Sequence, residues 1–227
     1  MEQNCQTNYQ TTGEEIANSA LHFIGTLLGI LGLVFLVNNA RSSLPAYVIF
    51  SSTMIFMFSA STVYHAIIPK NVKHFFRIID HQAIYIFIAG TYTPFCLLAL
   101  KGTLGRALFC FEWVLALTGV ILSAVQFRFI KKIEMVIFIL MGWAIIGGCI
   151  PLARSLSLQS VVLLFVGGVF YTAGTFWYRA GKPRDDGENT GLRPRKSRLF
   201  CGHVIWHLFV LAGAACHWFS VWFLCKT

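Results

Sequence analysis

Long apolar runs, separated by short polar segments, follow one another along almost the whole chain. A transmembrane helix needs about 20 predominantly apolar residues to cross the hydrocarbon core of a bilayer. Seven runs meet this length, at approximately residues 15–37, 44–67, 80–100, 104–126, 133–152, 157–179 and 200–225. The pattern predicts an all-α membrane protein with seven transmembrane helices.

Composition supports a membrane protein and leaves no room for a second, soluble domain. Hydrophobic residues make up 56% of the chain and charged residues only 12%, too little charge to coat a soluble globule of this size. We expect a short cytoplasmic tail over residues 1–14 and one seven-helix domain over residues 15–227. The polar stretch 180–199, broken by Gly and Pro, is expected to be a loop between the last two helices.

The distribution of basic residues predicts the orientation of the helices. Thirteen of the 18 Lys and Arg residues fall on the side that also carries the N-terminal tail. Basic residues accumulate on the cytoplasmic side of a membrane, so we expect a cytoplasmic N-terminus and an extracytoplasmic C-terminus in the cell membrane. The basic cluster "RPRKSR" (193–198) then lies beside anionic lipid. Membrane lipids, and no nucleic acid, are the expected partners.

Ionisable side chains recur at one depth of the predicted bundle. His203 and His207 stand one helical turn apart at the start of the seventh run, and His65 stands near the end of the second. These two runs have opposite directions, so the three histidines share the cytoplasmic side. Asp80 opens the predicted third run at the same level. An ionisable group inside a membrane span indicates a functional site, because its insertion costs roughly 2.5–3.5 kcal/mol.

Three imidazoles and a carboxylate at one level predict a zinc site with one Zn²⁺ per chain. His203 and His207 form a His-x-x-x-His pair, and His65 adds a third ligand, which leaves the fourth position open as in catalytic zinc sites. Asp80 is then an outer group or general base, and Ser61, one turn before His65, a hydrogen-bond donor to a water or substrate carbonyl. Two alternatives stay open: histidines that only bond neighbouring helices, and Asp80 as an N-cap.

Other polar residues in the runs predict structural contacts. His217 is expected to make a polar contact between helices. His22 shares a helical face with Asn18 and Glu15 and is expected to join the polar network beneath the site.

Several further residues carry weaker predictions. Glu112 and Glu134, with basic residues nearby, are expected at the membrane interface, and the role of His81 stays open. The glycines of "GTLLGILG" (25–32) predict close helix packing, and Pro94 predicts a bend in the third helix. The chain has seven cysteines but no Cys-x-x-Cys pair, so packing is favoured over disulfides or thiolate ligands.

Six stretches, in order along nearly the whole chain, resemble the hemolysin III family, the bacterial branch of the progestin and adipoQ receptor (PAQR) group that includes the adiponectin receptors. They are "EEIANSALH", "SASTVYH", "IDHQAIYIFIAGTYTP", "MGW", "GGVFYTAGTFWY" and "GHVIWHLFVLAGAACH". The resemblance implies zinc held by His65, His203 and His207, with Ser61 and Asp80 at the family's Ser and Asp positions. It also implies a cytoplasmic N-terminus and an extracytoplasmic C-terminus.

Three activities are consistent with this resemblance. The wider superfamily includes alkaline ceramidases, which implies zinc-dependent hydrolysis of a lipid amide or ester. The family name implies instead a cytolysin that acts on the membranes of target cells. The third alternative is a receptor or regulator in which zinc is structural.

Overall fold

The computed structural model describes residues 10–40, 44–100, 102–125, 128–180 and 201–226, and all regular structure in these ranges is helical. The elements are α1 (Thr12–Asn39), α2 (Leu44–Ala66), α3 (Lys70–Pro94), η1 (Phe95–Ala99), α4 (Thr103–Ala124), α5 (Arg128–Trp143), η2 (Ala144–Gly148), α6 (Cys149–Ser155), α7 (Leu158–Ala180) and α8 (Gly202–Lys226). Seven helical segments are long and apolar enough to cross a membrane, as predicted.

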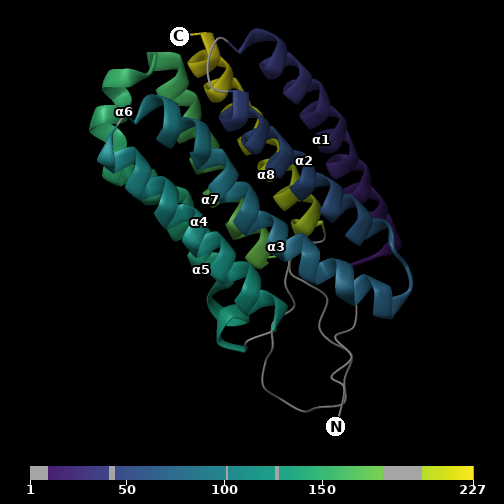
Figure 1. Ribbon diagram of the computed structural model, residues 1–227. Coiled ribbons are helices and arrows are strands. Elements are labelled where there is room, and N and C mark those ends of the chain that lie inside the picture. Colours follow the sequence, from purple (N-terminus) through teal and green to yellow (C-terminus); the bar gives the residue numbers. More distant parts are fainter. Residues whose placement is uncertain (1–9, 41–43, 101, 126–127, 181–200, 227) are drawn as a thin grey trace.

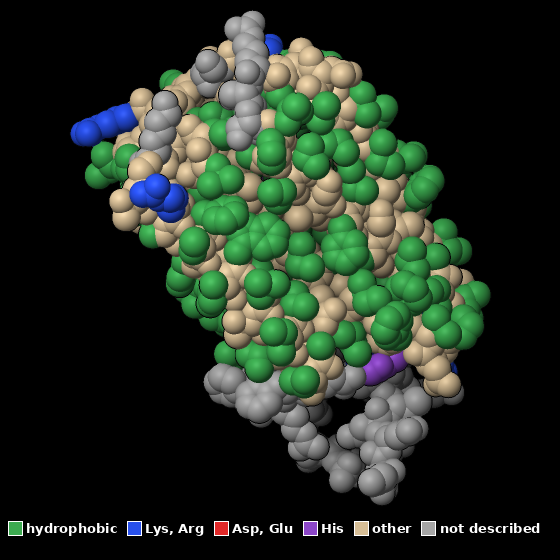
Figure 2. All heavy atoms as spheres, in the orientation of Figure 1, with side chains coloured by type: hydrophobic (Ala, Val, Ile, Leu, Met, Phe, Trp, Pro, Cys, Tyr) green, Lys and Arg blue, Asp and Glu red, His purple; other side chains and the backbone are tan. Residues whose placement is uncertain are grey.

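The helices form one bundle in which the first and last helices are neighbours (Figure 1). Helix α7 packs along α8, and α1 packs along both α2 and α8. Helix α1 begins near one end of the bundle and α8 ends near the other (Figure 1). Hydrophobic side chains cover the length of the face in Figure 2, and many large ones are exposed, among them Leu28 and Leu31 of α1. A soluble monomer rarely exposes so continuous an apolar surface, whereas lipid solvates it.

The third helix begins earlier than its apolar run predicts. Helix α3 starts at Lys70, so Asp80 lies well inside it and the expectation that Asp80 opens or caps the helix is wrong. In the first turn of α3, the charge of Lys73 has partners inside the protein. Lys73 is buried, and its Nζ donates to the backbone oxygens of Tyr64 and Ile67 at 3.2 Å, where α2 ends. A prediction based on apolar runs places such charged residues outside the helix.

Two further elements differ from uninterrupted α-helices. The fifth membrane-spanning segment, Ile133–Ser155, combines the end of α5 with the 3₁₀ turn η2 and the short α6. Regular α-helix ends at Pro94 and continues as the π-helical turn η1, where the missing N–H of proline predicts an irregularity. The predicted loop 180–199 lies outside the described residues, apart from residue 180. Residues 1–9 of the predicted tail also lie outside them.

Glycines bring α1 close to its neighbours, as the sequence predicts. Gly25, Gly29 and Gly32 are buried on one face of α1. A Cβ added at Gly25 would lie 2.8 Å from the ring of Phe58 in α2 and 3.0 Å from Leu211 in α8. A side chain at residue 25 would collide with both neighbours, so the absence of one allows the three helices to lie this close together.

We predict that Gly25→Ala destabilises the bundle. Overpacking a buried position costs about 1–3 kcal/mol, so the midpoint of thermal unfolding in detergent should fall by several degrees. Gly142→Ala is the matched control, because a Cβ at Gly142 meets nothing within 4 Å, and its midpoint should be unchanged or higher. Equal midpoints for the two variants would contradict the packing account.

Candidate metal site

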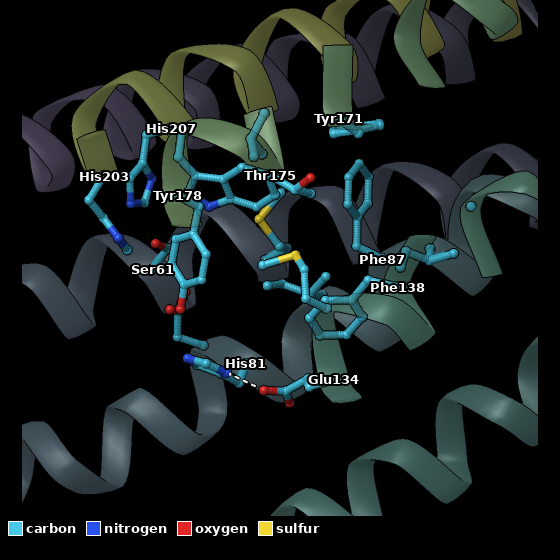
Figure 3. Close-up of a pocket in the computed structure, with 18 of the residues that line it drawn as sticks. Ser61, His81, Phe87, Glu134, Phe138, Tyr171, Thr175, Tyr178, His203 and His207 are labelled. Carbon is cyan, nitrogen blue, oxygen red and sulfur yellow. Dashed lines mark hydrogen bonds and ion pairs between the residues drawn. The ribbon is translucent and has the colours of Figure 1, made fainter. Parts of the chain in front are cut away.

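Three histidines from two helices converge at one end of the bundle. His65 lies in the last turn of α2, and His203 and His207 lie in the first turns of α8. One ring nitrogen from each lies within 4.8 Å of the other two. His65 and His207 are buried and His203 is partly buried. The predicted convergence of these residues is confirmed, and Figure 3 shows His203 and His207 side by side.

Helix α1 holds two of these rings through their Nδ1 atoms. Nδ1 of His65 lies 2.7 Å from Oε2 of Glu15, and Nδ1 of His207 bonds to Nε2 of His22. The other nitrogen, Nε2, of both His65 and His207 is buried without a hydrogen-bond partner within the described part of the chain. Buried polar atoms normally have partners. A metal ion would satisfy both, so the donor set fits the expected Zn²⁺.

The start of α8 is also tied to α1. The backbone N–H of Cys201 donates to Oε1 of Glu14 at 2.9 Å. The other oxygen of Glu14 accepts from the backbone N–H of Thr11 at 2.8 Å, in the capping box that begins α1. One carboxylate therefore fixes the starts of both helices, two residues before the first histidine of α8.

Ser61 and Asp80 line the same cavity as the histidines. Ser61 is buried on α2, one turn before His65. Asp80, on α3, lines this cavity with Ser61 and is close enough to influence both Ser61 and His65 electrostatically, while the Ser61 hydroxyl has no hydrogen-bond partner among the described residues. Asp80 is not a member of the three-histidine ligand group, so it lies beside the ligands rather than among them. The prediction that Asp80 lies at the level of the three histidines, with Ser61 one turn from His65, agrees with this arrangement.

His203 and His207 of the three-histidine group line a cavity of about 780 Å³. It is lined both by His207 and by His217, which stand ten residues apart on α8, or about 15 Å at 1.5 Å per residue. Polar side chains gather near His203 and His207, the His81–Glu134 pair forms a second polar patch, and apolar and aromatic side chains line much of the rest. Figure 3 shows Ser61, Tyr178, His203 and His207 on one side, with Phe87, Phe138 and Tyr171 farther along.

The other polar residues of the predicted helices either make specific contacts or are buried. Nε2 of His217 lies 3.0 Å from the backbone oxygen of Leu164, which confirms a polar contact between α8 and α7. His81 pairs with Glu134 at 2.8 Å across α3 and α5, and both line the cavity (Figure 3). Glu134 therefore belongs to the cavity wall. Glu112 is fully buried inside the protein, so its predicted interfacial position is wrong.

Sequence reasoning missed the direct contact between Glu15 and a ligand. Glu15 bonds His65 and also pairs with Lys73, whose Nζ lies 3.0 Å from Oε1. The available signal was the spacing of Glu15, Asn18 and His22, which places all three on the buried face of α1. That face predicted a polar network but did not reveal which ring each residue contacts.

Comparison with known proteins agrees with this architecture. The family described as "Haemolysin-III related" matches residues 10–218. The chain belongs to the haemolysin-III related family. It is 39% identical over 220 residues to "Hemolysin-3 homolog" of Bacillus subtilis (strain 168), covering 95% of this chain and 96% of that protein. "Hemolysin-3" of Bacillus cereus is 36% identical over 219 residues, covering 94% of this chain and 93% of that protein.

A mammalian relative is similar over nearly the same length of the chain. "Monocyte to macrophage differentiation factor" of Homo sapiens is 27% identical over 220 residues, covering 93% of this chain and 84% of that protein. Nearly the whole seven-helix chain is thus related to proteins from bacteria and animals. The haemolysin-III related family membership and the seven apolar helices together identify a multi-pass membrane protein.

We predict that the purified protein carries about one zinc per chain and that the double variant His203→Ala/His207→Ala loses it, because two of the three imidazoles are removed. Elemental mass spectrometry of detergent-purified protein measures the stoichiometry. His217→Gln is the control, since His217 belongs to α8 but not to the ligand group, and it should keep its zinc. Well-folded wild-type protein without metal would contradict the prediction.

Proposed function

We propose that this protein is a zinc-dependent hydrolase of a lipid amide or ester, with its site near the cytoplasmic face of the cell membrane. The observation that supports the proposal is a three-histidine group of which two members, His203 and His207, line a long, largely apolar cavity. A structural zinc site is normally closed by four protein ligands. The three-histidine group has no fourth His, Cys, Asp or Glu among the described residues, which favours catalysis.

His65, His203 and His207 would hold the ion. A zinc ion at such a site polarises a carbonyl oxygen and makes water more acidic. Imidazole also suits copper, iron and nickel. Zinc is proposed from the ligand type together with the family.

Two further side chains would act on the reacting atoms. Asp80, beside Ser61 and His65, is proposed to accept a proton from the attacking water and to return it to the leaving group. The hydroxyl of Ser61 is proposed to donate a hydrogen bond to the carbonyl oxygen, where negative charge develops. The apolar cavity wall, with Phe87 and Phe138 (Figure 3), would bind the acyl chain.

A membrane-lytic activity is the second candidate, supported by the name of the relatives called "Hemolysin-3". The hydrophobic character of all seven helices disfavours a toxin that travels through water before it inserts. Lipid hydrolysis offers an indirect route to lysis, because its products disturb a bilayer.

We predict that Asp80→Asn lowers kcat by about 10²–10⁴-fold, the usual contribution of a general base. Ser61→Ala should lower kcat by about 10²–10³-fold, as expected for loss of a hydrogen bond to the oxyanion. Both variants should keep their zinc. The measurement is the release of fatty acid from a panel of fluorescent ceramides and acyl esters in mixed micelles.

Ser155→Ala is the control for this series, because Ser155 is exposed and bonds only within α6, so kcat should not change. A wild-type protein that binds zinc but cleaves no lipid of the panel would contradict the hydrolase and leave zinc a structural role. Lysis of vesicles by the wild type and Asp80→Asn alike would favour the cytolysin.

The excess of basic residues on one side predicts the orientation. A reporter that is active only outside the cytoplasm, such as alkaline phosphatase, should be active when fused after the C-terminus and inactive when fused before the N-terminus. Alkaline phosphatase activity in a bacterial host measures this directly. The reverse pattern would place the three-histidine group at the extracytoplasmic face.

A further inference from the structure

Helix α1 supplies no member of the three-histidine group, yet it contacts two of its three rings. We infer that Glu15 and His22 are positioning residues, which fix the orientation and the tautomer of His65 and His207 so that Nε2 of each faces the metal. The inference rests on the proposed metal site. Partners of this kind orient the first ligands of most metal sites and strengthen their binding.

The contact between Glu15 and His65 fixes one tautomer. An ionised carboxylate has only acceptor atoms, so at 2.7 Å from Oε2 the Nδ1 of His65 must carry the hydrogen. Nε2 then keeps its lone pair and points away from Glu15. This is the nitrogen that is buried without a hydrogen-bond partner. The pair therefore presents a ligand atom, and not an N–H, to the group.

The contact between His22 and His207 has two possible polarities, and only one suits a metal. If His22 donates, neutral His207 carries its hydrogen on Nε2 and directs an N–H toward the other ligands. If His207 donates from Nδ1, its Nε2 lone pair is free for the ion. His22 must then accept at Nε2 and carry its own hydrogen on Nδ1.

Asn18 places a buried acceptor on the same face of α1 as His22, although no hydrogen bond joins the two side chains. Nδ2 of Asn18 donates to Oε1 of Gln10 at 3.2 Å, and the other amide atom, Oδ1, is an acceptor. This Oδ1 and Nδ1 of His22 are both buried without a hydrogen-bond partner, one helical turn apart on α1. An acceptor and a donor on one face match the polarity in which His207 donates to His22.

Lys73 balances the charge of Glu15 and holds the end of α2. Its Nζ lies 3.0 Å from Oε1 of Glu15 and donates to the backbone oxygens of Tyr64 and Ile67. A buried carboxylate is tolerated when it is paired in this way. The backbone on both sides of His65 is thus held by the same lysine that neutralises the partner of its ring. Three helices meet at this point.

The inference is tested by zinc affinity, measured by competition with a chromogenic chelator on the purified full-length protein. Glu15→Ala and His22→Phe should each weaken zinc binding by about 10–100-fold, the usual effect of losing such a partner. Glu15→Gln and His22→Gln keep an oxygen that can accept a hydrogen bond from the ligand ring. They should therefore bind zinc more tightly than Glu15→Ala and His22→Phe do. Ser19→Ala is the control, because it removes a hydrogen bond from α1 to Thr62 of α2 without touching a ligand, and it should bind zinc as the wild type does.

The visible spectrum of the cobalt-substituted protein supplies a second readout. Its bands should shift in Glu15→Ala and His22→Phe and stay unchanged in Ser19→Ala, because only the first two alter the ligand geometry. Thermal unfolding of the metal-free proteins identifies any variant that does not fold. For such a position, the zinc affinity of the Gln variant is compared with that of the wild type instead. Wild-type affinity and spectra in folded Glu15→Ala and His22→Phe would overturn the inference. Absence of zinc from the wild type would instead overturn the proposed function.

Discussion

The hydrogen bonds between α1 and the imidazoles of α2 and α8 are the interaction on which the site depends. A polar ring buried in a membrane protein is costly unless its nitrogens have partners. Glu15 and His22 satisfy one nitrogen of His65 and of His207 and leave the other facing the group. A metal ion at that position would give the second nitrogen, Nε2, of both rings a partner. The α1 residues thus leave two buried ring nitrogens that a metal ion could satisfy.

The rest of α1 makes this contact geometrically possible. The face that begins with Glu15, Asn18 and His22 continues with Gly25 and Gly29. Small residues let α1 lie close to α2 and α8, and the polar residues then reach the histidines one or two turns away. Helices α3, α5 and α7 complete the cavity with apolar side chains such as Phe87 and Phe138, and with the polar pair His81–Glu134. A cluster of polar side chains and a largely apolar part of the cavity therefore meet inside one bundle, which supports the proposed reaction on a lipid.

The seven helices and the convergence of three histidines could be predicted, because length, hydropathy and helix direction determine them together. The start of α3 could not, because it depends on Lys73 finding carbonyl oxygens at the end of α2. The contact of Glu15 with His65 was also missed. Helical spacing shows which residues share a face, but not how two helices are rotated against each other. The burial of Glu112 was missed for the same reason.

The central claim is that three imidazoles bind one zinc ion inside the bundle. X-ray absorption spectroscopy at the zinc edge, on protein purified in detergent, tests it most directly. The account predicts a shell of nitrogen and oxygen atoms only, at about 2.0–2.1 Å, with the outer scattering of about three imidazole rings. Sulfur scatterers at about 2.3 Å would assign the metal to cysteines. That result, or a spectrum without imidazole scattering, would contradict the account.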